Sequence, residues 1–218
     1  MNNVFWMKEF AGFPTVVVAN GEVPSSELSL NVLKEKKRVV CCDGALQKLL
    51  SVNIIPDVVV GDGDSMDSKK LSRHGIPYHA DKSEEYNDLQ KALKYCMANG
   101  CEEVLLLGCG GLREDHFIAN LSIMVMYSDK MCLSMLTEHG VFNVLRGREQ
   151  YQAVPGMQVS VFPSAPQTKL SFNGLKYPVN NHSFQWLWEG SLNEALNDSF
   201  VVEASDDEPV VVYRALNS

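Results

Sequence analysis

The chain has 218 residues, of which 45% are hydrophobic, and this is enough to bury a substantial core in one or two domains. Its 27 acidic side chains outnumber 19 basic ones, the formal net charge is −8, and no basic block interleaved with aromatic residues marks a nucleic-acid surface. The composition argues against a nucleic-acid partner, and an acidic protein that used a nucleotide would need a metal ion to neutralise the phosphates.

The cysteines and the N-terminal segment bear on the cellular compartment. The six cysteines form neither a CxxC pair nor the Cys/His spacing of a zinc site, so we expect buried thiols. Lys8 and Glu9 follow Phe5 and Trp6 closely, unlike the long apolar run of a signal peptide. No apolar run approaches the roughly 20 residues of a membrane span. We expect a cytoplasmic protein with no membrane partner.

The first two thirds of the sequence alternate short β-branched runs with helical patterns. The patterns predict strands over 15–20, 38–42, 57–60, 76–79 and 103–107, and helices over 25–37, 45–52, 67–74, 84–99 and 115–127. Gly75 and Gly100 provide stop signals for two of these helices. Repeated strand–helix units of this length predict an α/β fold with an open, mostly parallel sheet and helices on both faces.

The pattern changes from about Leu133. Alternating runs at 141–145, 158–162, 200–204 and 210–213 are separated by Gly, Pro and Asn clusters, and no helical period follows Tyr127. These features predict a small antiparallel domain. We therefore expect two domains, residues 1–140 and 141–218, with the boundary between about residues 138 and 150.

Polar residues follow four of the predicted parallel strands. Ligands bind at the carboxyl ends of such strands, where the loops converge and helix N-termini point inward. An acid or a glycine-rich turn follows each strand in these segments: Cys42-Asp43-Gly44, Val60 to Ser65, Asp81 to Asp88, and Gly108 to His116. This repeated placement predicts a ligand site at one edge of the sheet.

Asp62 and Asp64 are two residues apart, so in an extended backbone both carboxylates lie on one face. Two carboxylates about 4 Å apart repel by roughly 4 kcal/mol at an effective dielectric near 20, so either a cation binds or one of them takes a proton. Hard oxygen ligands suit magnesium. A structural alternative is that the acids cap the next helix, with Ser65 as its N-cap. Asp88, in a first helical turn, also has a sufficient structural explanation in the helix dipole.

The segment from Gly108 to His116 carries the strongest local signal. Glycines between a strand and a helix let backbone N–H groups approach phosphate oxygens, and Arg113 adds a planar donor fork. Asp115 follows as a possible metal ligand, and His116 shares a helix face with Asn120. The alternative is an ordinary tight turn with a capping acid, but Arg, Asp and His directly after the glycines favour function. No GxxxxGK[ST], protein-kinase or GxSxG signature is present.

Taken in order, these segments resemble those of the thiamine pyrophosphokinase family over most of the chain. The motifs that carry the resemblance are Asp43-Gly44-Ala45, Pro56-Asp57, Gly61-Asp62-Gly63-Asp64-Ser65, Asn87-Asp88, Gly108 to Asn120, Gly174-Leu175-Lys176-Tyr177 and Ser191-Leu192-Asn193-Glu194. The resemblance implies an N-terminal α/β domain, a C-terminal β-sandwich, and a homodimer whose active sites form between subunits. It implies pyrophosphoryl transfer from ATP to thiamine, giving thiamine diphosphate and AMP.

The resemblance also implies roles for individual residues. Magnesium would be held by Asp62, Asp64 and Asp88, and these acids with Asp115 and Arg113 would form the catalytic set. The expected ATP-binding residues are Asp43, Asn87, Gly110, Gly111, Arg113 and His116. Thiamine would lie near Ser191 and Asn193, with Trp188, or else Trp186, offering a ring to the cationic thiazolium. Buried core packing is the structural alternative for either tryptophan.

Three departures from the family pattern concern mainly how the acceptor is bound. Asn87 stands where the family usually has Thr, Gly63 replaces a commonly bulky residue, and Leu192 is inserted into a Ser-Asn-Glu turn. Other functions stay open: a pyrophosphokinase for another alcohol such as a pterin, a magnesium-dependent phosphatase, or a non-enzymatic nucleotide sensor. The proton acceptor is equally open between Asp88 and Asp115.

Overall fold

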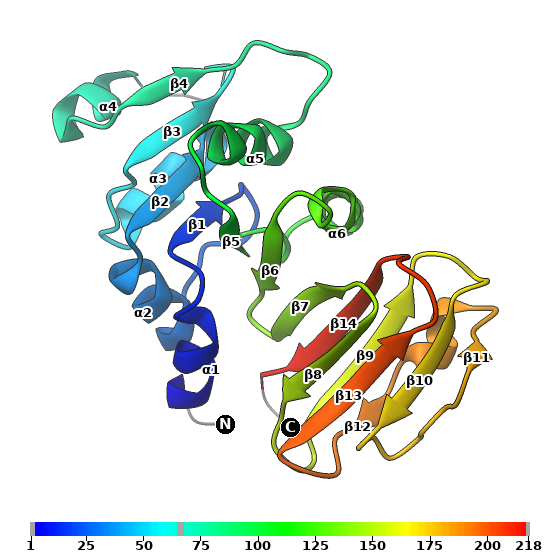
Figure 1. Ribbon diagram of the computed structural model, residues 1–218. Coiled ribbons are helices and arrows are strands. Elements are labelled where there is room, and N and C mark those ends of the chain that lie inside the picture. The colour runs from blue at the N-terminus through cyan, green and yellow to red at the C-terminus, as the bar shows by residue number, and fades with distance from the viewer. Residues whose placement is uncertain (1–2, 65–67, 217–218) are drawn as a thin grey trace. The chain divides into compact units, whose positions relative to one another are not determined.

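The computed structural model describes residues 3–64 and 68–216. The chain divides into two compact units between Glu138 and His139 (Figure 1).

The N-terminal unit is built on six parallel strands in the order β6-β5-β1-β2-β3-β4. The strands are β1 (Thr15–Val18), β2 (Arg38–Cys42), β3 (Val58–Gly61), β4 (Tyr78–Ala80), β5 (Glu103–Leu107) and β6 (Cys132–Leu136). The central strands β1 and β3 are buried along their whole length, as strands covered on both faces must be. The predicted α/β fold with a mostly parallel sheet is confirmed.

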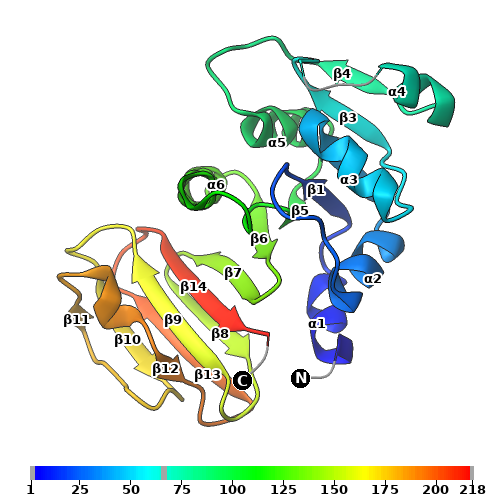
Figure 2. The ribbon, with the colours of Figure 1, turned by 180° about the vertical axis from the view of Figure 1, so that it is seen from behind.

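Helices cover both faces of this sheet. They are α1 (Asn3–Phe10), α2 (Glu27–Glu35), α3 (Leu46–Ser51), α4 (Ser68–His74), α5 (Asp88–Ala98) and α6 (Glu114–Tyr127), with a short 3₁₀ turn, η1 (Asp43–Ala45), before α3. Figures 1 and 2 show α2 and α3 on one face and α5 and α6 on the other. Within the part of the chain that is described, no helix combines the length and apolar character needed to cross a membrane.

Local capping explains where α5 begins and ends. The Asn87 side chain accepts a hydrogen bond from the backbone N–H of Gln90, and the Gln90 side chain accepts one from the Asn87 N–H, which forms a capping box. Gly100, with φ +69°, ends the helix in left-handed backbone. The helix therefore starts at Asp88 instead of the predicted Glu84, and this places Asp88 in its first turn.

Two elements of this unit were not predicted. Helix α1 buries Trp6 and Phe10, which are four residues apart and stack with a ring separation of 6.0 Å, so the helical spacing was present in the sequence. Strand β6 is buried on both faces from its second residue, so it lacks the alternation that marks a half-buried strand. The start of the predicted helix 67–74 and its cap Ser65 lie outside the described residues.

The C-terminal unit contains two four-stranded antiparallel sheets, in the orders β12-β9-β14-β7 and β11-β10-β13-β8. Their strands are β7 (Gly140–Leu145), β8 (Arg148–Gln152), β9 (Gln158–Pro163), β10 (Lys169–Asn173), β11 (His182–Ser183), β12 (Asn193–Glu194), β13 (Ser199–Ala204) and β14 (Val210–Ala215), with the 3₁₀ turn η2 (Leu187–Gly190) before β12. The Arg214 guanidinium on β14 lies 5.0 Å from the Tyr151 ring on β8, so side chains of the two sheets meet in a sandwich. The predicted antiparallel C-terminal domain is confirmed.

Candidate active site

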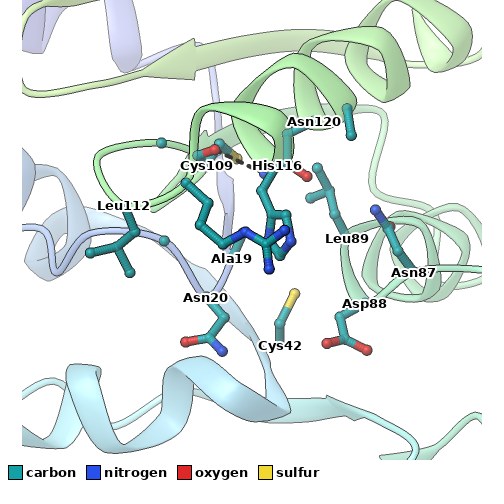
Figure 3. Close-up of a pocket in the computed structure, with 14 residues that line it drawn as sticks. Ala19, Asn20, Cys42, Asn87, Asp88, Leu89, Cys109, Leu112, His116 and Asn120 are labelled. Carbon is teal, nitrogen blue, oxygen red and sulfur yellow. Dashed lines mark hydrogen bonds between the residues drawn. The ribbon is translucent and has the colours of Figure 1, made fainter.

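A cavity of about 540 Å³ lies at the carboxyl edge of the parallel sheet. The ends of β1, β2 and β5 and the first turns of α5 and α6 provide its walls (Figure 3). It is lined by Ala19, Asn20, Gly21, Cys42, Asn87, Asp88, Leu89, Cys109, Gly110, Leu112, Arg113, His116, Ala119 and Asn120. The cavity therefore lies where an open parallel sheet binds its ligands, and it includes Asn87, Asp88, Gly110, Arg113 and His116 from the predicted site.

The glycine-rich loop after β5 is fastened to the loop after β1 by backbone contacts. Gly21 N–H donates to the carbonyl of Gly108 at 2.6 Å, and Glu22 N–H donates to that of Gly110 at 2.7 Å. A Cβ atom at Gly108 would lie 2.5 Å from the carbonyl oxygen of Ala19, and φ at Gly108 is +65°. Both the close approach and the left-handed backbone require glycine here. This backbone-to-backbone packing gives the glycine turn a structural reason, in addition to the phosphate binding that the sequence predicts for it.

Arg113 and Asp115 form a bidentate ion pair at the rim of the cavity. Nε of Arg113 lies 3.0 Å from Oδ1 of Asp115, and a terminal nitrogen lies 2.5 Å from Oδ2. This pair lowers the pKa of the Asp115 carboxyl. The two side chains are 68% and 62% exposed, so the guanidinium is accessible to a ligand. Asp115 thus pairs with Arg113, and no contact with the other predicted acids is found within residues 3–64 and 68–216.

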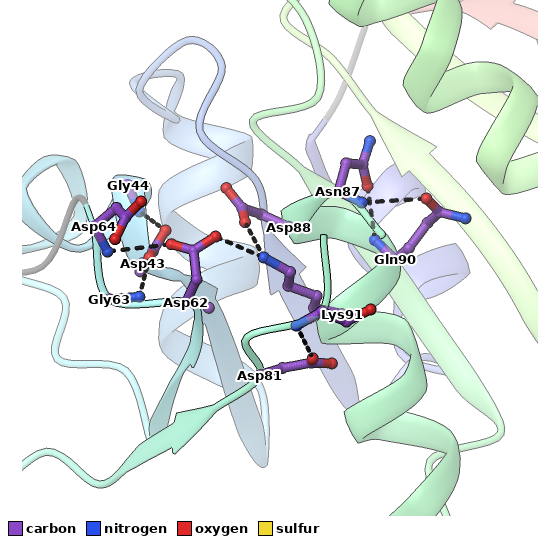
Figure 4. A network of polar contacts seen from close by, with 12 residues as sticks. Asp43, Gly44, Asp62, Gly63, Asp64, Asp81, Asn87, Asp88, Gln90 and Lys91 are labelled. Carbon is purple, nitrogen blue, oxygen red and sulfur yellow. Dashed lines mark hydrogen bonds and ion pairs between the residues drawn. The ribbon is translucent and has the colours of Figure 1, made fainter. Parts of the chain in front are cut away.

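Four acids gather beside the cavity at the ends of β2 and β3 and the start of α5; we call Asp43, Asp62, Asp64 and Asp88 the acid edge (Figure 4). Nζ of Lys91 lies 2.7 Å from Oδ2 of Asp62 and 3.5 Å from Oδ1 of Asp88. The hydrogen bond from Lys91 lowers the pKa of Asp62. Lys91 was not predicted, although its place three residues after Asp88, on the buried face of a helix, was a readable signal.

Asp43 is the buried member of the acid edge. Its carboxylate is 2% exposed and accepts hydrogen bonds from the N–H groups of Gly44, at 2.6 Å, and Gly63, at 3.2 Å. Burial and the nearby Asp88 raise the pKa of Asp43. The Tyr78 hydroxyl donates to the carbonyl of Gly61 at 2.8 Å, so the loop that carries Asp62 is held at both ends.

The oxygen donors fit a magnesium ion that also binds phosphate. In the described segments, no three His, Cys, Asp or Glu side chains converge as a complete ligand set. Asp62 and Asp88 nevertheless face a single ammonium group, as they would face a cation. Magnesium typically takes one or two carboxylates and completes its octahedron with water and phosphate oxygens. Asp64 is close by, because its N–H donates to Oδ1 of Asp62 at 3.1 Å.

The thiols at the cavity are poor nucleophiles. Burial raises the pKa of the Cys109 thiol to about 12 and raises that of Cys42 well above its usual range. Both therefore carry their protons at neutral pH. The six cysteines are present as thiols; five of them are buried, but Cys132 is exposed. The prediction of buried thiols is wrong for Cys132, because it is the first residue of β6 and only the following residues enter the core.

The predicted thiamine residues lie in the C-terminal unit. Trp186 and Trp188 are 69% and 72% exposed, so the alternative that they pack in the core is wrong. The Ser191 hydroxyl donates to the carbonyl of Trp188 at 2.6 Å. Asn193 is buried, and its carboxamide accepts from the N–H and donates to the carbonyl of Tyr177. Asn193 therefore positions the loop around it.

Leu192, which the family resemblance gives as an insertion, adopts left-handed backbone between Ser191 and Asn193. Its φ is +61°, and its side chain is 78% exposed. A non-glycine residue rarely takes this conformation outside a tight turn. The insertion is therefore accommodated by a sharp turn that leaves Ser191 and Asn193 in separate local environments.

The parallel sheet carries acids and a glycine-rich loop at its carboxyl edge, and the chain continues into an antiparallel sandwich. These features define a two-domain α/β enzyme of the phosphate-handling class. Two family models match the chain: "Thiamin pyrophosphokinase, catalytic domain" over residues 30–135 and "Thiamin pyrophosphokinase, substrate-binding domain" over residues 140–213. The chain belongs to the thiamin pyrophosphokinase family. Among curated proteins, no sequence matches it.

Solved structures agree in fold. Thiamin pyrophosphokinase from Candida albicans superposes with a TM-score of 0.80 at 18% identity, covering 95% of this chain and 92% of that one. The Bacillus subtilis enzyme gives 0.78 at 17% identity, with 94% and 99% covered. The yeast enzyme gives 0.76 at 14% identity, with 93% and 86% covered. The similarity therefore extends over both units at low sequence identity.

Proposed function

We propose that this chain is a thiamine pyrophosphokinase that uses Mg²⁺ and transfers a pyrophosphoryl group from ATP to thiamine. The observation that carries the proposal is the meeting of two kinds of group at one sheet edge. Asp88 lines the same cavity as Gly110, Arg113 and His116, and it also shares Lys91 with Asp62. Carboxylates for a metal and donors for phosphate are thus brought together in a chain of this family.

The nucleotide phosphates are proposed to lie against the glycine-rich loop. Gly110 lines the cavity and offers its backbone N–H group, and Arg113 and His116 offer side-chain donors from the start of α6. Gly111, the other predicted glycine, follows Gly110 in the same loop but does not line the cavity. Asn87 lines the facing wall. Asp43 acts on the nucleotide indirectly, because it is buried and bonded to Gly44 and Gly63.

Asp62, Asp64 and Asp88 are the proposed ligands of Mg²⁺. When bound, the ion neutralises charge on the phosphate oxygens, which is the main requirement of phosphoryl-type transfer. Asp62 is already poised as an anion, because Lys91 lowers its pKa. Tyr78 and Asp43 hold the loop of Asp62 and Asp64, so little reorganisation is needed.

The reaction proposed is attack of the thiamine hydroxyl oxygen on the β-phosphorus of ATP. The new bond joins that oxygen to the β-phosphorus, the bond from the β-phosphorus to the oxygen bridging the α- and β-phosphates breaks, and AMP leaves with that oxygen. Arg113 stabilises the charge on the transferring group. Asp88 and Asp115 are the two candidates to accept the hydroxyl proton; Asp115 is paired with Arg113, and Asp88 faces Lys91.

Thiamine is proposed to bind in the C-terminal unit near Ser191 and Asn193, with the thiazolium against the exposed Trp188 ring. A cationic acceptor also suits a chain of net charge −8. We propose further that the protein is a cytoplasmic homodimer whose active sites form between subunits, with ATP and thiamine as its ligands and no nucleic-acid or membrane partner. These points rest on the family resemblance and on composition.

An acceptor panel tests the proposal. The protein is incubated with ATP and Mg²⁺ alone, with thiamine, or with a hydroxymethylpterin, and the products are separated by chromatography. We expect AMP and thiamine diphosphate only in the thiamine arm. AMP formation with the pterin would favour the other pyrophosphokinase, inorganic phosphate without acceptor would favour the phosphatase, and ATP binding without AMP would indicate a nucleotide sensor.

A further inference from the structure

Lys91 is a buried lysine directed at the acid edge. It lies in α5 one turn after Asp88, and only 3% of the residue is exposed. Lysine is almost never buried to this extent unless it is paired. Its partners here are Asp62 and Asp88, which come from two different segments of the chain. The two acids therefore stabilise the buried ammonium group of Lys91, and its burial would be unfavourable without them.

The ammonium group takes the position that a cation shared by the two acids would take. Oδ2 of Asp62 lies 2.7 Å from Nζ, and Oδ1 of Asp88 lies 3.5 Å from it (Figure 4). Lys91 donates a hydrogen bond to Asp62 and also faces Asp88, and two carboxylates beside an ammonium group favour its charged form. Lysine is ordinarily a cation at neutral pH, so we take Lys91 as a positive charge at this point.

A fixed positive charge at this point has opposite effects on a free metal ion and on a nucleotide. A divalent ion approaching Asp62 and Asp88 meets the charge of Lys91 and competes for the same carboxylate oxygens. A nucleotide brings several negative charges, which can compensate the ammonium and the metal together. The same lysine thus weakens binding of the bare ion and tolerates binding of the ion with its phosphates.

We propose that Lys91 is a positioning residue that serves as the internal counter-ion of the acid edge. It holds Asp62 and Asp88 together in the metal-free protein, and it keeps the affinity for a free divalent ion low so that the metal enters with the nucleotide. This inference rests on the proposed function, because it takes Asp62 and Asp88 as metal ligands.

The test measures Mn²⁺ binding to the nucleotide-free protein by electron paramagnetic resonance of the free ion. Lys91→Met and Lys91→Gln both remove the charge, and thermal melts identify the variants that fold. We expect either folded variant to bind Mn²⁺ at least about tenfold more tightly than the wild type. Lys91→Arg keeps the charge, so its affinity should stay within about twofold of the wild type.

Lys94→Met provides the matched control. Lys94 is in the same helix, but its ammonium group lies over the Tyr86 ring, 3.5 Å from the centroid. We expect its removal to leave Mn²⁺ affinity unchanged. Equal or weaker binding by folded Lys91→Met and Lys91→Gln, or equal tightening in Lys94→Met, would overturn the proposal.

A separate assay of thiamine diphosphate formation by the wild type distinguishes failure of the proposed function from failure of the counter-ion role. Failure there, with Mn²⁺ affinities as expected, would contradict the enzyme assignment and leave the counter-ion role standing. Thiamine diphosphate formation with unchanged Mn²⁺ affinities would contradict the counter-ion role alone.

Discussion

Oδ2 of Asp43 accepts a hydrogen bond from the N–H of Gly63 at 3.2 Å, and this bond ties the end of β2 to the loop that carries Asp62 and Asp64. The same carboxylate fills the space beside Gly61, where a Cβ atom would lie 2.4 Å from Cγ of Asp43. A buried acid thus fixes the spacing between two neighbouring strand ends. The cost of burying it has a measurable consequence.

Asp43→Asn should change how stability depends on pH. The pKa of Asp43 is raised in the folded protein, so the folded state holds its proton more tightly than the unfolded chain does. Its favourable contribution is present below the unfolded value of about 3.9 and is lost as pH rises through the folded pKa. Denaturant unfolding with EDTA, from about pH 4 to 7, should show wild-type stability falling relative to Asp43→Asn. A constant difference would contradict the raised pKa.

Asp62→Asn should lower turnover by about a hundredfold or more while the protein stays folded, because a proposed metal ligand loses its charge. Lys91 keeps Asp88 as a partner, so the loss of stability should be about 1 kcal/mol. Steady-state formation of thiamine diphosphate and circular dichroism check the two parts. Asp129→Asn, at an exposed turn, is the control. Full activity of folded Asp62→Asn would refute the metal role.

Arg113→Lys should raise KM for ATP about tenfold, because an ammonium group replaces the planar donor fork. The pair with Asp115 is well exposed, so the free energy of unfolding should hardly change. Initial rates at varied ATP measure the effect, with Arg73→Lys on the exposed side of α4 as control. An unchanged KM would remove Arg113 from the phosphate site.

Gly108→Ala should be more destabilising than Gly100→Ala. Both glycines have positive φ, +65° and +69°, so both alanines suffer backbone strain of about 1 kcal/mol. Only at Gly108 would the new Cβ also meet a backbone oxygen, that of Ala19 at 2.5 Å. Denaturant unfolding should give a further loss of about 1–3 kcal/mol for Gly108→Ala. Equal losses in the two variants would mean that the close approach of the loops is unimportant.

Trp188→Ala should raise KM for thiamine between about twofold and thirtyfold, which corresponds to about 0.5–2 kcal/mol for a cation–π contact. The side chain is exposed, so stability should hardly change. Trp186→Ala removes a ring of almost equal exposure. Comparing the two variants therefore shows which tryptophan contacts thiamine. A larger effect of Trp186→Ala would transfer the thiazolium contact to that residue.

The parts of the fold that follow a clear period were predictable. Strands β2 and β5 have the bounds expected from their apolar runs, and helix α6 begins one residue early. The helix predicted over 84–99 begins only at Asp88, because Asn87 and Gln90 form its N-terminal cap. The charged residues before Asn87 made this cap hard to recognise in the sequence. Strand β6 was missed because burial on both faces removes alternation.

The candidate site was predictable in its acids and glycines but not in its pairings. Strand ends located Asp62, Asp88 and Gly108, because connectivity in a parallel sheet brings them to one edge. The ammonium of Lys91 between Asp62 and Asp88 depends on the rotation of α5 against β3, which no short sequence window contains. The exposure of Trp188 likewise depends on how η2 lies on the sandwich.

In the proposed reaction, pyrophosphate moves as a unit from ATP to thiamine at this site. Phosphorus NMR of the wild type with ATP, thiamine and Mg²⁺ observes this directly. We predict that the signals of thiamine diphosphate and AMP rise together in equal amounts, and that EDTA stops both. Appearance of ADP with thiamine monophosphate, or of inorganic phosphate instead of AMP, would contradict the account.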